Sequence, residues 1–450
     1  MNIDQLHQAF SRRELSPVTV LETLLDEIEA DKQDINAFVL IDREVALEQA
    51  RASEQRFANG TPIGPLDGIP VSVKDMIAVR GWPNRRGSRA TEHDPVPAKD
   101  APSVAALRAA GAVIFGKTTS TEFGWTIMSS NPHTGVTRNP VNPLHSAGGS
   151  SSGAAAHVAK GWGPLALGSD AGGSVRIPAA LCGVVGFKPT YGAIPSPPLS
   201  AFADFAHQGV ITRTVADAQV AFASLSKGHY SDPCSLFQRS FESRPGKYLK
   251  IGWCDRIDAD DVIDASVDQR FQEVREKLSE QGYWLERVNL KTEGFAHSIW
   301  AVWVARIFES FQSWPDEKRQ LLDSALLRVY DEGAAIDTAS VSAGRTALRD
   351  FHNRLNAVFG EVDILLTPTT SAPAPQLPDA SACTPTELNW FAGNSFAFPF
   401  NMSHQPGISM PVGTSPEGLP IGLQIVGRKY ADQQVLSFSA EIEPILNLFT

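Results

Sequence analysis

Three short stretches of the chain carry residue types that could act together in catalysis. Ser174 ends the glycine-rich stretch GSDAGGS, Ser150 follows two glycines in AGGSSSG, and Lys74 lies at the end of the apolar stretch IPVSVKD. A serine hydroxyl is a weak nucleophile until a neighbouring base accepts its proton. If the fold brings these stretches together, they could supply a serine nucleophile, a second hydroxyl and a lysine amine, whereas Ser150 alone could equally serve only to cap a helix.

The glycine-rich stretch around Ser174 is suited to hold a negatively charged oxygen. Gly172 and Gly173 have no side chains that would block the approach of a substrate or restrict φ. The backbone N–H groups from Ala171 to Ser174 are therefore expected to form an oxyanion hole. A strand-to-helix turn that binds nothing, or a phosphate-binding loop, would have the same composition.

Lys74 is the expected proton acceptor because the histidines form no recognisable pattern. The ten histidines show no serine–histidine–carboxylate signature, and Arg176 stands where the second glycine of a GxSxG nucleophile elbow would be. Burial disfavours a charged amine, so a lysine at the end of an apolar strand tends to lose its proton. A neutral lysine can act as the base.

The elements around these stretches indicate an α/β fold. Ser16 and Pro17 are typical of a helix start, and residues 42–58 are predicted to form a second helix that stops at Asn59. Short apolar stretches then alternate with alanine-rich ones, as in crossover units around a buried sheet. The predicted strands begin near residues 69, 113, 165, 184, 209, 250, 362, 407 and 421.

Strands at both ends of the chain favour one sheet, and therefore a single domain over residues 1–450. Within it we expect N-terminal helices over residues 1–60, a catalytic core over about 61–230 and a helical insertion over about 260–360. The polar residues 231–250 are predicted to form a loop.

Composition excludes several classes of protein. The formal charge of −11 is spread along the chain without a long basic run, which argues against a nucleic-acid partner. No signal-peptide pattern and no apolar run long enough to span a bilayer is found, so we expect a cytoplasmic protein without a membrane partner. The cysteines are far apart and form no CxxC pair, which indicates reduced thiols without a zinc site. They are Cys182, Cys234, Cys254 and Cys383.

Residues 147–192, AGGSSSGAAAHVAKGWGPLALGSDAGGSVRIPAALCGVVGFKPTYG, closely resemble the signature region of the amidase signature family. The resemblance covers practically the whole chain and implies the family's fold, a central twisted mixed β-sheet covered by helices on both faces. It extends to residues 64–75, 107–124, 137–140, 364–370 and 398–427.

The resemblance implies a Ser/cis-Ser/Lys triad and an amidohydrolase that cleaves C–N bonds without a cofactor or metal. Ser174 would be the nucleophile that forms the acyl-enzyme, Ser150 the bridging serine after a cis peptide bond, and Lys74 the base. In similar proteins the residues at positions 170 and 176 hold the loop by hydrogen bonds. Asp170, Arg176 and Ser151 are therefore expected to support the triad.

The sequence departs from the family pattern near the predicted site. Asn84, Arg85 and Arg86 stand where a Thr-Thr pair is common, so they are expected to alter a loop close to the site. Ala171 replaces a frequent Thr and Ser152 replaces a frequent Gly. Neither change removes a member of the triad.

The segments expected to line the acyl pocket are rich in aromatic residues. An apolar pocket favours apolar or aryl acyl groups, and the same attack on a carbamate (urethane) or ester carbonyl needs no further residue. Aromatic residues at such spacing also form cores. The candidate pocket residues are Trp125, Met128, Ser129, Phe202 and Phe396, and Phe205, Trp390 and Phe391 lie in the same segments.

Two other functions are consistent with the same residues. The family includes the A subunit of glutamine-dependent tRNA amidotransferases, which releases ammonia from glutamine for a partner protein. An inactive binding scaffold is the second alternative, although the intact Lys74, Ser150 and Ser174 argue against it. The expected partners are a small amide, carbamate or ester and water, with the protein a monomer or homodimer.

Overall fold

A mixed β-sheet forms the centre of the molecule in the computed structural model, which describes residues 1–197, 202, 204–235, 243–257, 262–290, 295–377 and 395–446. Within these residues the sheet has 11 strands in the order β1-β3-β2-β6-β8-β7-β12-β13-β11-β9-β10. The strands are β1 Phe38–Ile41, β2 Pro70–Lys74, β3 Val113–Thr118, β6 Leu165–Asp170, β7 Val185–Lys188, β8 His207–Thr212, β9 Ile251–Trp253, β10 Leu285–Arg287, β11 Ile364–Pro368, β12 Gly407–Thr414 and β13 Pro420–Gly427. A separate short pair is formed by β4 Ser130–Asn131 and β5 Gly135–Val136.

The sheet is parallel where the predicted site lies and largely antiparallel beyond it. Strand β2 pairs in parallel with both β3 and β6, as the alternation of apolar and alanine-rich stretches predicts. Strands β6, β8, β7, β12, β13 and β11 then pair antiparallel in succession. The nine strands predicted from the sequence are all present, whereas the edge strands β1 and β10 were not predicted.

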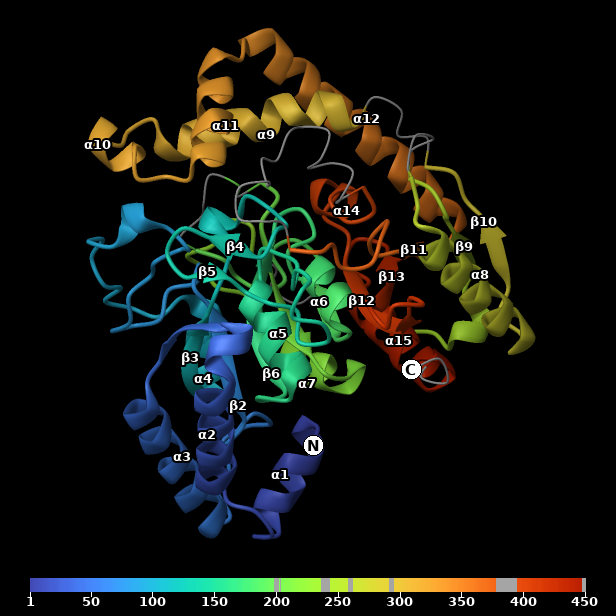
Figure 1. The fold of residues 1–450 in the computed structure, drawn as a ribbon. Helices are drawn as coiled ribbons and strands as arrows, with labels where there is room; N and C mark the ends of the chain where they lie inside the picture. Colours follow the sequence, from blue (N-terminus) through green and yellow to red (C-terminus); the bar gives the residue numbers. More distant parts are fainter. Residues whose placement is uncertain are drawn as a thin grey trace.

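Helices cover both faces of the sheet, which confirms the expected fold class (Figure 1). They are α1 Ile3–Ser11, α2 Pro17–Ile35, α3 Arg43–Ala58, α4 Pro102–Ala109, α5 Ser152–Lys160, α6 Arg176–Cys182, α7 Val215–Leu225, α8 Ala265–Glu280, α9 Phe295–Phe311, α10 Asp316–Arg319, α11 Ser324–Ala335, α12 Thr338–Glu361, α14 Pro399–Met402 and α15 Asp432–Leu446. Short 3-10 helices are Arg89–Thr91, Glu122–Gly124 and Gly246–Tyr248.

Alternate residues of β6 show how the two faces are buried. Leu165 and Leu167 belong to the core that contains residues of α4, α7 and α15 on one face. Ala166 belongs to the core that contains residues of α2, α5 and α6 on the other. Both faces of this strand are therefore apolar, as expected for a strand in the middle of a covered sheet.

Helices α9, α10, α11 and α12 follow β10 and precede β11, and they form an arch at one end of the molecule (Figure 1). A third core joins them to β11, β13 and the residues around α14. This arch lies within the predicted helical insertion. The division of the chain into one domain stays a prediction.

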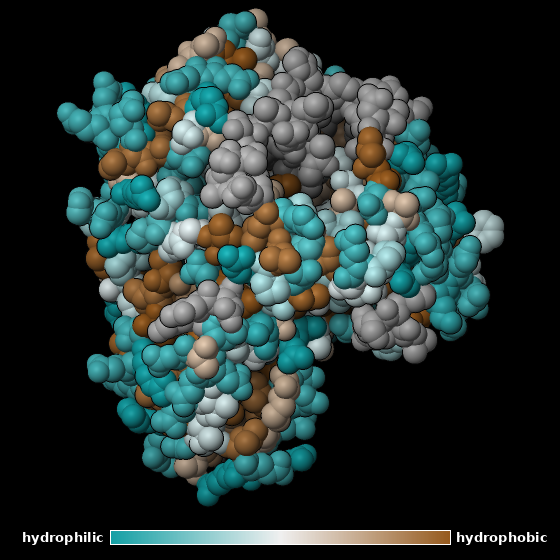
Figure 2. Space-filling view, viewed as in Figure 1, coloured by the Kyte–Doolittle hydropathy of each residue, from teal (hydrophilic) through white to brown (hydrophobic). Residues whose placement is uncertain are grey.

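Hydrophilic residues cover most of the visible face, and apolar residues gather between the arch and helices α1 to α3 (Figure 2). None of the helices described here is both long and apolar enough to cross a membrane. No disulfide links Cys182, Cys234 or Cys254 to another cysteine within the described residues, and Cys383 lies outside them.

Candidate functional site

The predicted site residues lie at the carboxyl ends of two neighbouring strands. Val71 pairs with Leu165 and Val73 with Leu167, so β2 and β6 run side by side in parallel. Lys74 is the last residue of β2, and the loop that carries Ser174 follows β6 directly. The carboxyl ends of parallel strands meet at one edge of a sheet, which is where α/β folds bind ligands.

Lys74 contacts Ser150 directly. Its Nζ donates to Ser150 Oγ at 2.7 Å and to the carbonyl oxygen of Ser169 at 3.2 Å. The side chain is completely buried, and this burial lowers the pKa of Lys74 to about 7, although the nearby charge of Asp170 acts to raise it. An amine with such a pKa is partly neutral at physiological pH and can accept a proton.

Ser150 and Ser174 are brought together by the main chain around them. The Gly149–Ser150 peptide bond is cis, and the next amide, that of Ser151, donates to the Ser174 carbonyl at 3.1 Å. The Ser151 hydroxyl donates to the Ser169 carbonyl at 3.2 Å, which is the same oxygen that Lys74 contacts. The Ser174 hydroxyl makes no hydrogen bond to the described part of the chain.

The loop before Ser174 is closed by the carboxylate of Asp170. Its Oδ1 accepts the Gly173 amide at 2.6 Å, and its Oδ2 accepts the Val175 amide at 3.1 Å. Gly173 has φ of +117°, and a Cβ there would lie only 2.6 Å from the Ala397 side chain, so glycine is required. The Gly173 amide already donates to Asp170, so it is not free to bind an oxyanion. Of the four expected donors, the amides of Ala171, Gly172 and Ser174 remain.

A buried polar network holds Asp170. Arg176 forms a two-point ion pair with it, Nε to Oδ2 and Nη2 to Oδ1, both at 3.0 Å. Burial alone would raise the pKa of Asp170, but Arg176 lowers it well below the usual range. Arg176 also donates to Gln424 Oε1 and to Asn401 Oδ1, each at 2.6 Å. Arg176 therefore links Asp170 to Gln424 and Asn401, two residues that the sequence reasoning missed.

Gln424 connects Arg176, which holds the loop before Ser174, to the segment that carries Phe396. While its Oε1 accepts from Arg176, its Nε2 donates to the Phe396 carbonyl at 2.7 Å and to Thr367 Oγ1 at 2.8 Å. The only signal in the sequence was a glutamine within the apolar strand GLQIVG. A polar residue buried in a central strand needs partners, so such a residue marks a hydrogen-bond network.

Gln424→Leu should lower kcat/KM by about 10- to 100-fold, because Arg176 would lose an acceptor and the loop it holds would shift relative to the substrate. Steady-state kinetics on any amide that the wild type cleaves measure kcat/KM, and urea unfolding in parallel measures the free energy of unfolding. Gln433→Leu on the exposed face of α15 is the matched control and should change neither quantity. A Gln424→Leu variant with wild-type kcat/KM would exclude a positioning role.

The predicted pocket residues have different surroundings. Trp125, Phe202 and Phe396 are 3%, 8% and 1% exposed and pack in the core beneath the arch, as does Phe205. Met128 is half-buried. The Ser129 hydroxyl donates to the Thr137 carbonyl at 2.6 Å and is buried. Trp390 and Phe391 lie outside the described residues.

The segment from Glu122 to Trp125 connects the site to the arch. A Cβ at Gly124 would lie 3.1 Å from Ser150 Oγ, so this segment runs directly past the serine. Glu122 accepts the Ser88 hydroxyl at 2.6 Å and the amide of Asp323, at the start of α11, at 2.9 Å. Burial raises the pKa of Glu122 to about 7.

The stretch with Asn84, Arg85 and Arg86 contacts the same region. The Lys117 ammonium, buried beside Asp75, donates to Asn84 Oδ1 at 2.5 Å, and the Arg85 amide donates to Asp75 Oδ1 at 3.2 Å. The Arg86 carbonyl accepts the Phe123 amide at 2.8 Å. The departure from the family pattern therefore lies in a loop bonded to the segment that passes Ser150.

A buried serine–histidine pair offers no alternative site. Ser72 Oγ lies 2.6 Å from His157 Nε2, but both side chains are completely inaccessible. Burial lowers the pKa of His157 to about 4. No substrate can reach this pair. Among the residues described, no three His, Cys, Asp or Glu side chains gather where a metal ion could bind.

Comparison with known proteins relates the whole chain to amidases. The Amidase family model matches residues 19–436. The chain is 32% identical to an acylamidase of Rhodococcus erythropolis, over 99% of this chain and 95% of that protein. It is 31% identical to a subunit of the glutamyl-tRNA(Gln) amidotransferase of Carboxydothermus hydrogenoformans, over 98% and 96%. A bacterial aryl acylamidase of the amidase signature family superimposes with a TM-score of 0.90 at 29% identity, over 99% and 96%.

Proposed function

The chain belongs to the amidase signature family, and on that premise we propose that it hydrolyses carboxylic amides through an acyl-enzyme on Ser174. The hydrogen bond of 2.7 Å between the buried Lys74 amine and the Ser150 hydroxyl carries this proposal. Lys74, with a pKa of about 7, can accept a proton from Ser150. The residue after Ser150, Ser151, donates its amide to the Ser174 carbonyl.

In the first half-reaction, Ser174 Oγ attacks the amide carbonyl carbon. Its proton passes to Ser150 Oγ while the proton of Ser150 passes to Lys74 Nζ. The carbonyl oxygen becomes an oxyanion, which the amides of Ala171, Gly172 and Ser174 stabilise. When the C–N bond breaks, the proton returns from Lys74 through Ser150 to the leaving nitrogen.

In the second half-reaction, water attacks the acyl-enzyme. Its proton follows the same path to Lys74, a second oxyanion forms, and the C–O bond to Ser174 breaks as the proton returns to Ser174. Carbamates and esters have the same carbonyl geometry and need no additional group. We therefore include both among the proposed substrates.

We propose an apolar or aryl acyl group because the segment that passes Ser150, and Ala171 in the loop before Ser174, pack in or against the apolar core under the arch. A series of p-nitroanilides with lengthening alkyl and aryl acyl groups, alongside matched carbamates and esters, tests this. Each buried CH₂ should raise kcat/KM by about fourfold, corresponding to about 0.8 kcal/mol. A preference for malonamate-like acids would contradict the proposal.

A glutaminase assay beside these measurements separates this function from a role in a glutamyl-tRNA(Gln) amidotransferase, the enzyme to which the relative from Carboxydothermus hydrogenoformans belongs. Glutamine would be a poor substrate for an apolar pocket. If the purified protein released ammonia from glutamine faster than it cleaved aryl amides, the amidotransferase function would replace the one proposed here.

A further inference from the structure

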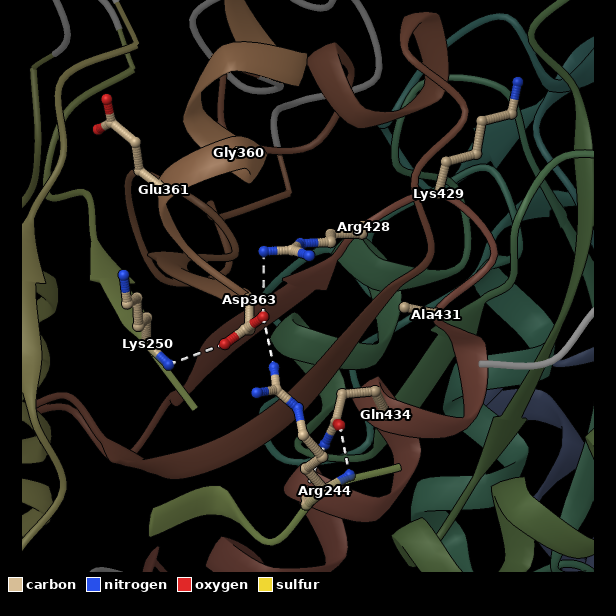
Figure 3. A pocket seen from close by; sticks show the side chains of 9 residues that line it. All are labelled: Arg244, Lys250, Gly360, Glu361, Asp363, Arg428, Lys429, Ala431 and Gln434. Atoms are coloured by element: carbon tan, nitrogen blue, oxygen red, sulfur yellow. Dashed lines mark hydrogen bonds and ion pairs between the residues drawn. The ribbon is translucent and has the colours of Figure 1, made fainter. Parts of the chain in front are cut away.

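A cleft with a volume of about 620 Å³ lies beside the ends of β9, β11 and β13, and Figure 3 shows the side chains that line it. It is located where β9 and β11 begin and β13 ends, since Ile364 pairs with both Ile251 and Gly427. Four strand-to-strand steps separate β6 from β13, which corresponds to roughly 19 Å at about 4.8 Å per step. The lining residues are Arg244, Lys250, Gly360, Glu361, Asp363, Arg428, Lys429, Ala431 and Gln434.

The cleft is cationic, although the chain as a whole carries a formal charge of −11. Four of the lining side chains are basic and two are acidic, so the formal surplus is 4 − 2 = +2. The Lys250 and Lys429 ammonium groups form no ion pair with any residue that the structure describes. Such a surplus in a concave surface attracts anions.

The two arginines are held in place by Asp363. Its Oδ1 accepts Arg244 Nη2 at 2.6 Å and Arg428 Nη2 at 3.1 Å, and its Oδ2 accepts the Lys250 amide at 3.0 Å (Figure 3). These three bonds compensate the Asp363 charge. This carboxylate therefore orients the guanidinium groups and is itself neutralised.

Further hydrogen bonds fix the orientation of Arg244 and Arg428 and leave one nitrogen of Arg428 available to a ligand. Arg428 also donates from Nε and Nη2 to the Val362 carbonyl, both at 3.3 Å, which leaves its Nη1 without a partner in the described residues. Gln434 clamps the Arg244 main chain, since its Oε1 accepts the amide at 2.7 Å and its Nε2 donates to the carbonyl at 2.9 Å. The Arg244 and Arg428 side chains remain 53% and 47% exposed.

We propose that this cleft binds a phosphate group, either as a free ion or as part of a small phosphorylated molecule. Phosphate is the oxyanion that matches the surplus, because it carries about two negative charges at neutral pH, whereas a carboxylate carries one. Guanidinium forks and lysine ammonium groups are its usual partners. The cleft volume is in the range of small-molecule sites.

Calorimetric titration of the full-length protein with inorganic pyrophosphate, at constant ionic strength, tests the proposal. We expect saturable binding with one equivalent, and a Kd about tenfold higher in Lys250→Gln/Lys429→Gln, the change that the loss of two charge contacts would give. These lysines have no described ion-pair partner, so the variant should fold. Tighter binding of a nucleoside diphosphate than of pyrophosphate would identify an organic phosphate, and equal binding a free one.

Lys227→Gln/Lys247→Gln is the matched control, because both residues are exposed lysines outside the cleft and the change in net charge is the same. This control should bind pyrophosphate as the wild type does. Four results would each overturn the proposal. They are the absence of saturable binding, an unchanged Kd in Lys250→Gln/Lys429→Gln, an equal loss of pyrophosphate affinity in the control, and tighter binding of citrate than of pyrophosphate or the nucleoside diphosphate.

Discussion

Ser174→Ala should lower kcat by about 10⁴-fold or more on any amide that the wild type cleaves. The substitution removes the oxygen that would form the acyl-enzyme and leaves the amides of the loop in place. The Ser174 hydroxyl makes no hydrogen bond to the residues that the structure describes, so its loss should leave the free energy of unfolding nearly unchanged. A fluorophosphonate should attach to the wild type with one equivalent and fail to attach to the variant, as intact mass measurement would show.

Ser152→Ala is the matched control for this substitution. Ser152 belongs to the same serine-rich stretch as Ser150 and is buried, but its hydroxyl has no hydrogen-bond partner in the described residues. Its removal should change kcat less than threefold, a small effect expected where no interaction is lost. Labelling that persists in Ser174→Ala would exclude Ser174 as the nucleophile, and a wild type that resists labelling would favour an inactive scaffold.

The parts of the fold that the sequence predicted are those with a strong local signal. Strands β2, β3 and β6 are runs of apolar residues between alanine-rich helices, and this composition alone indicates buried parallel strands. Strands β1 and β10 lie at the two edges of the sheet and are short. Residues at an edge are only partly buried, so their composition differs little from that of a loop.

The site was predictable to the extent that its residues follow strand ends directly. Lys74 ends β2 and Ser174 follows β6, so knowing that the two strands are parallel neighbours is enough to bring both residues to one edge. Asn401 and Gln424 are 225 and 248 residues from Arg176, and their contacts depend on the pairing of β12 and β13 with the rest of the sheet. Periodicity contains no information on such pairings.

The acyl pocket shows a different limit of sequence reasoning. Trp125 and Phe396 were candidates because they are aromatic and close in sequence to predicted site segments, but they are 3% and 1% exposed and belong to the core under the arch. Composition cannot separate an aromatic residue that packs against a helix from one that contacts a ligand. Gly124 is more informative, because a Cβ at this position would lie 3.1 Å from Ser150 Oγ. The segment from Glu122 to Trp125 therefore passes directly beside Ser150.

Lys74→Met should lower kcat/KM by about 10²- to 10⁴-fold, the usual contribution of a general base. In the wild type, burial lowers the pKa of Lys74 to about 7, so the neutral amine should be a minor form below that pH. We therefore expect kcat/KM to rise about tenfold per pH unit from pH 5 to 6 and to level off above about pH 8. Initial rates on a neutral amide in a constant-ionic-strength buffer series measure this profile.

Linkage gives a second measurement that does not depend on catalysis. The unfolded chain keeps the Lys74 proton up to its ordinary pKa of 10.5, whereas the folded chain releases it near 7, so the unfolded state binds more protons between these values. The free energy of unfolding should therefore rise with pH across that window in the wild type, and this contribution should be missing in Lys74→Met.

Addition of ethylamine to Lys74→Ala should restore part of the activity, because a free amine can enter the vacated space beside Ser150. If the stability difference appeared without any amine rescue and the rate were flat from pH 5 to 8, Lys74 would be a buried structural lysine, and a different group would have to accept the proton of Ser174.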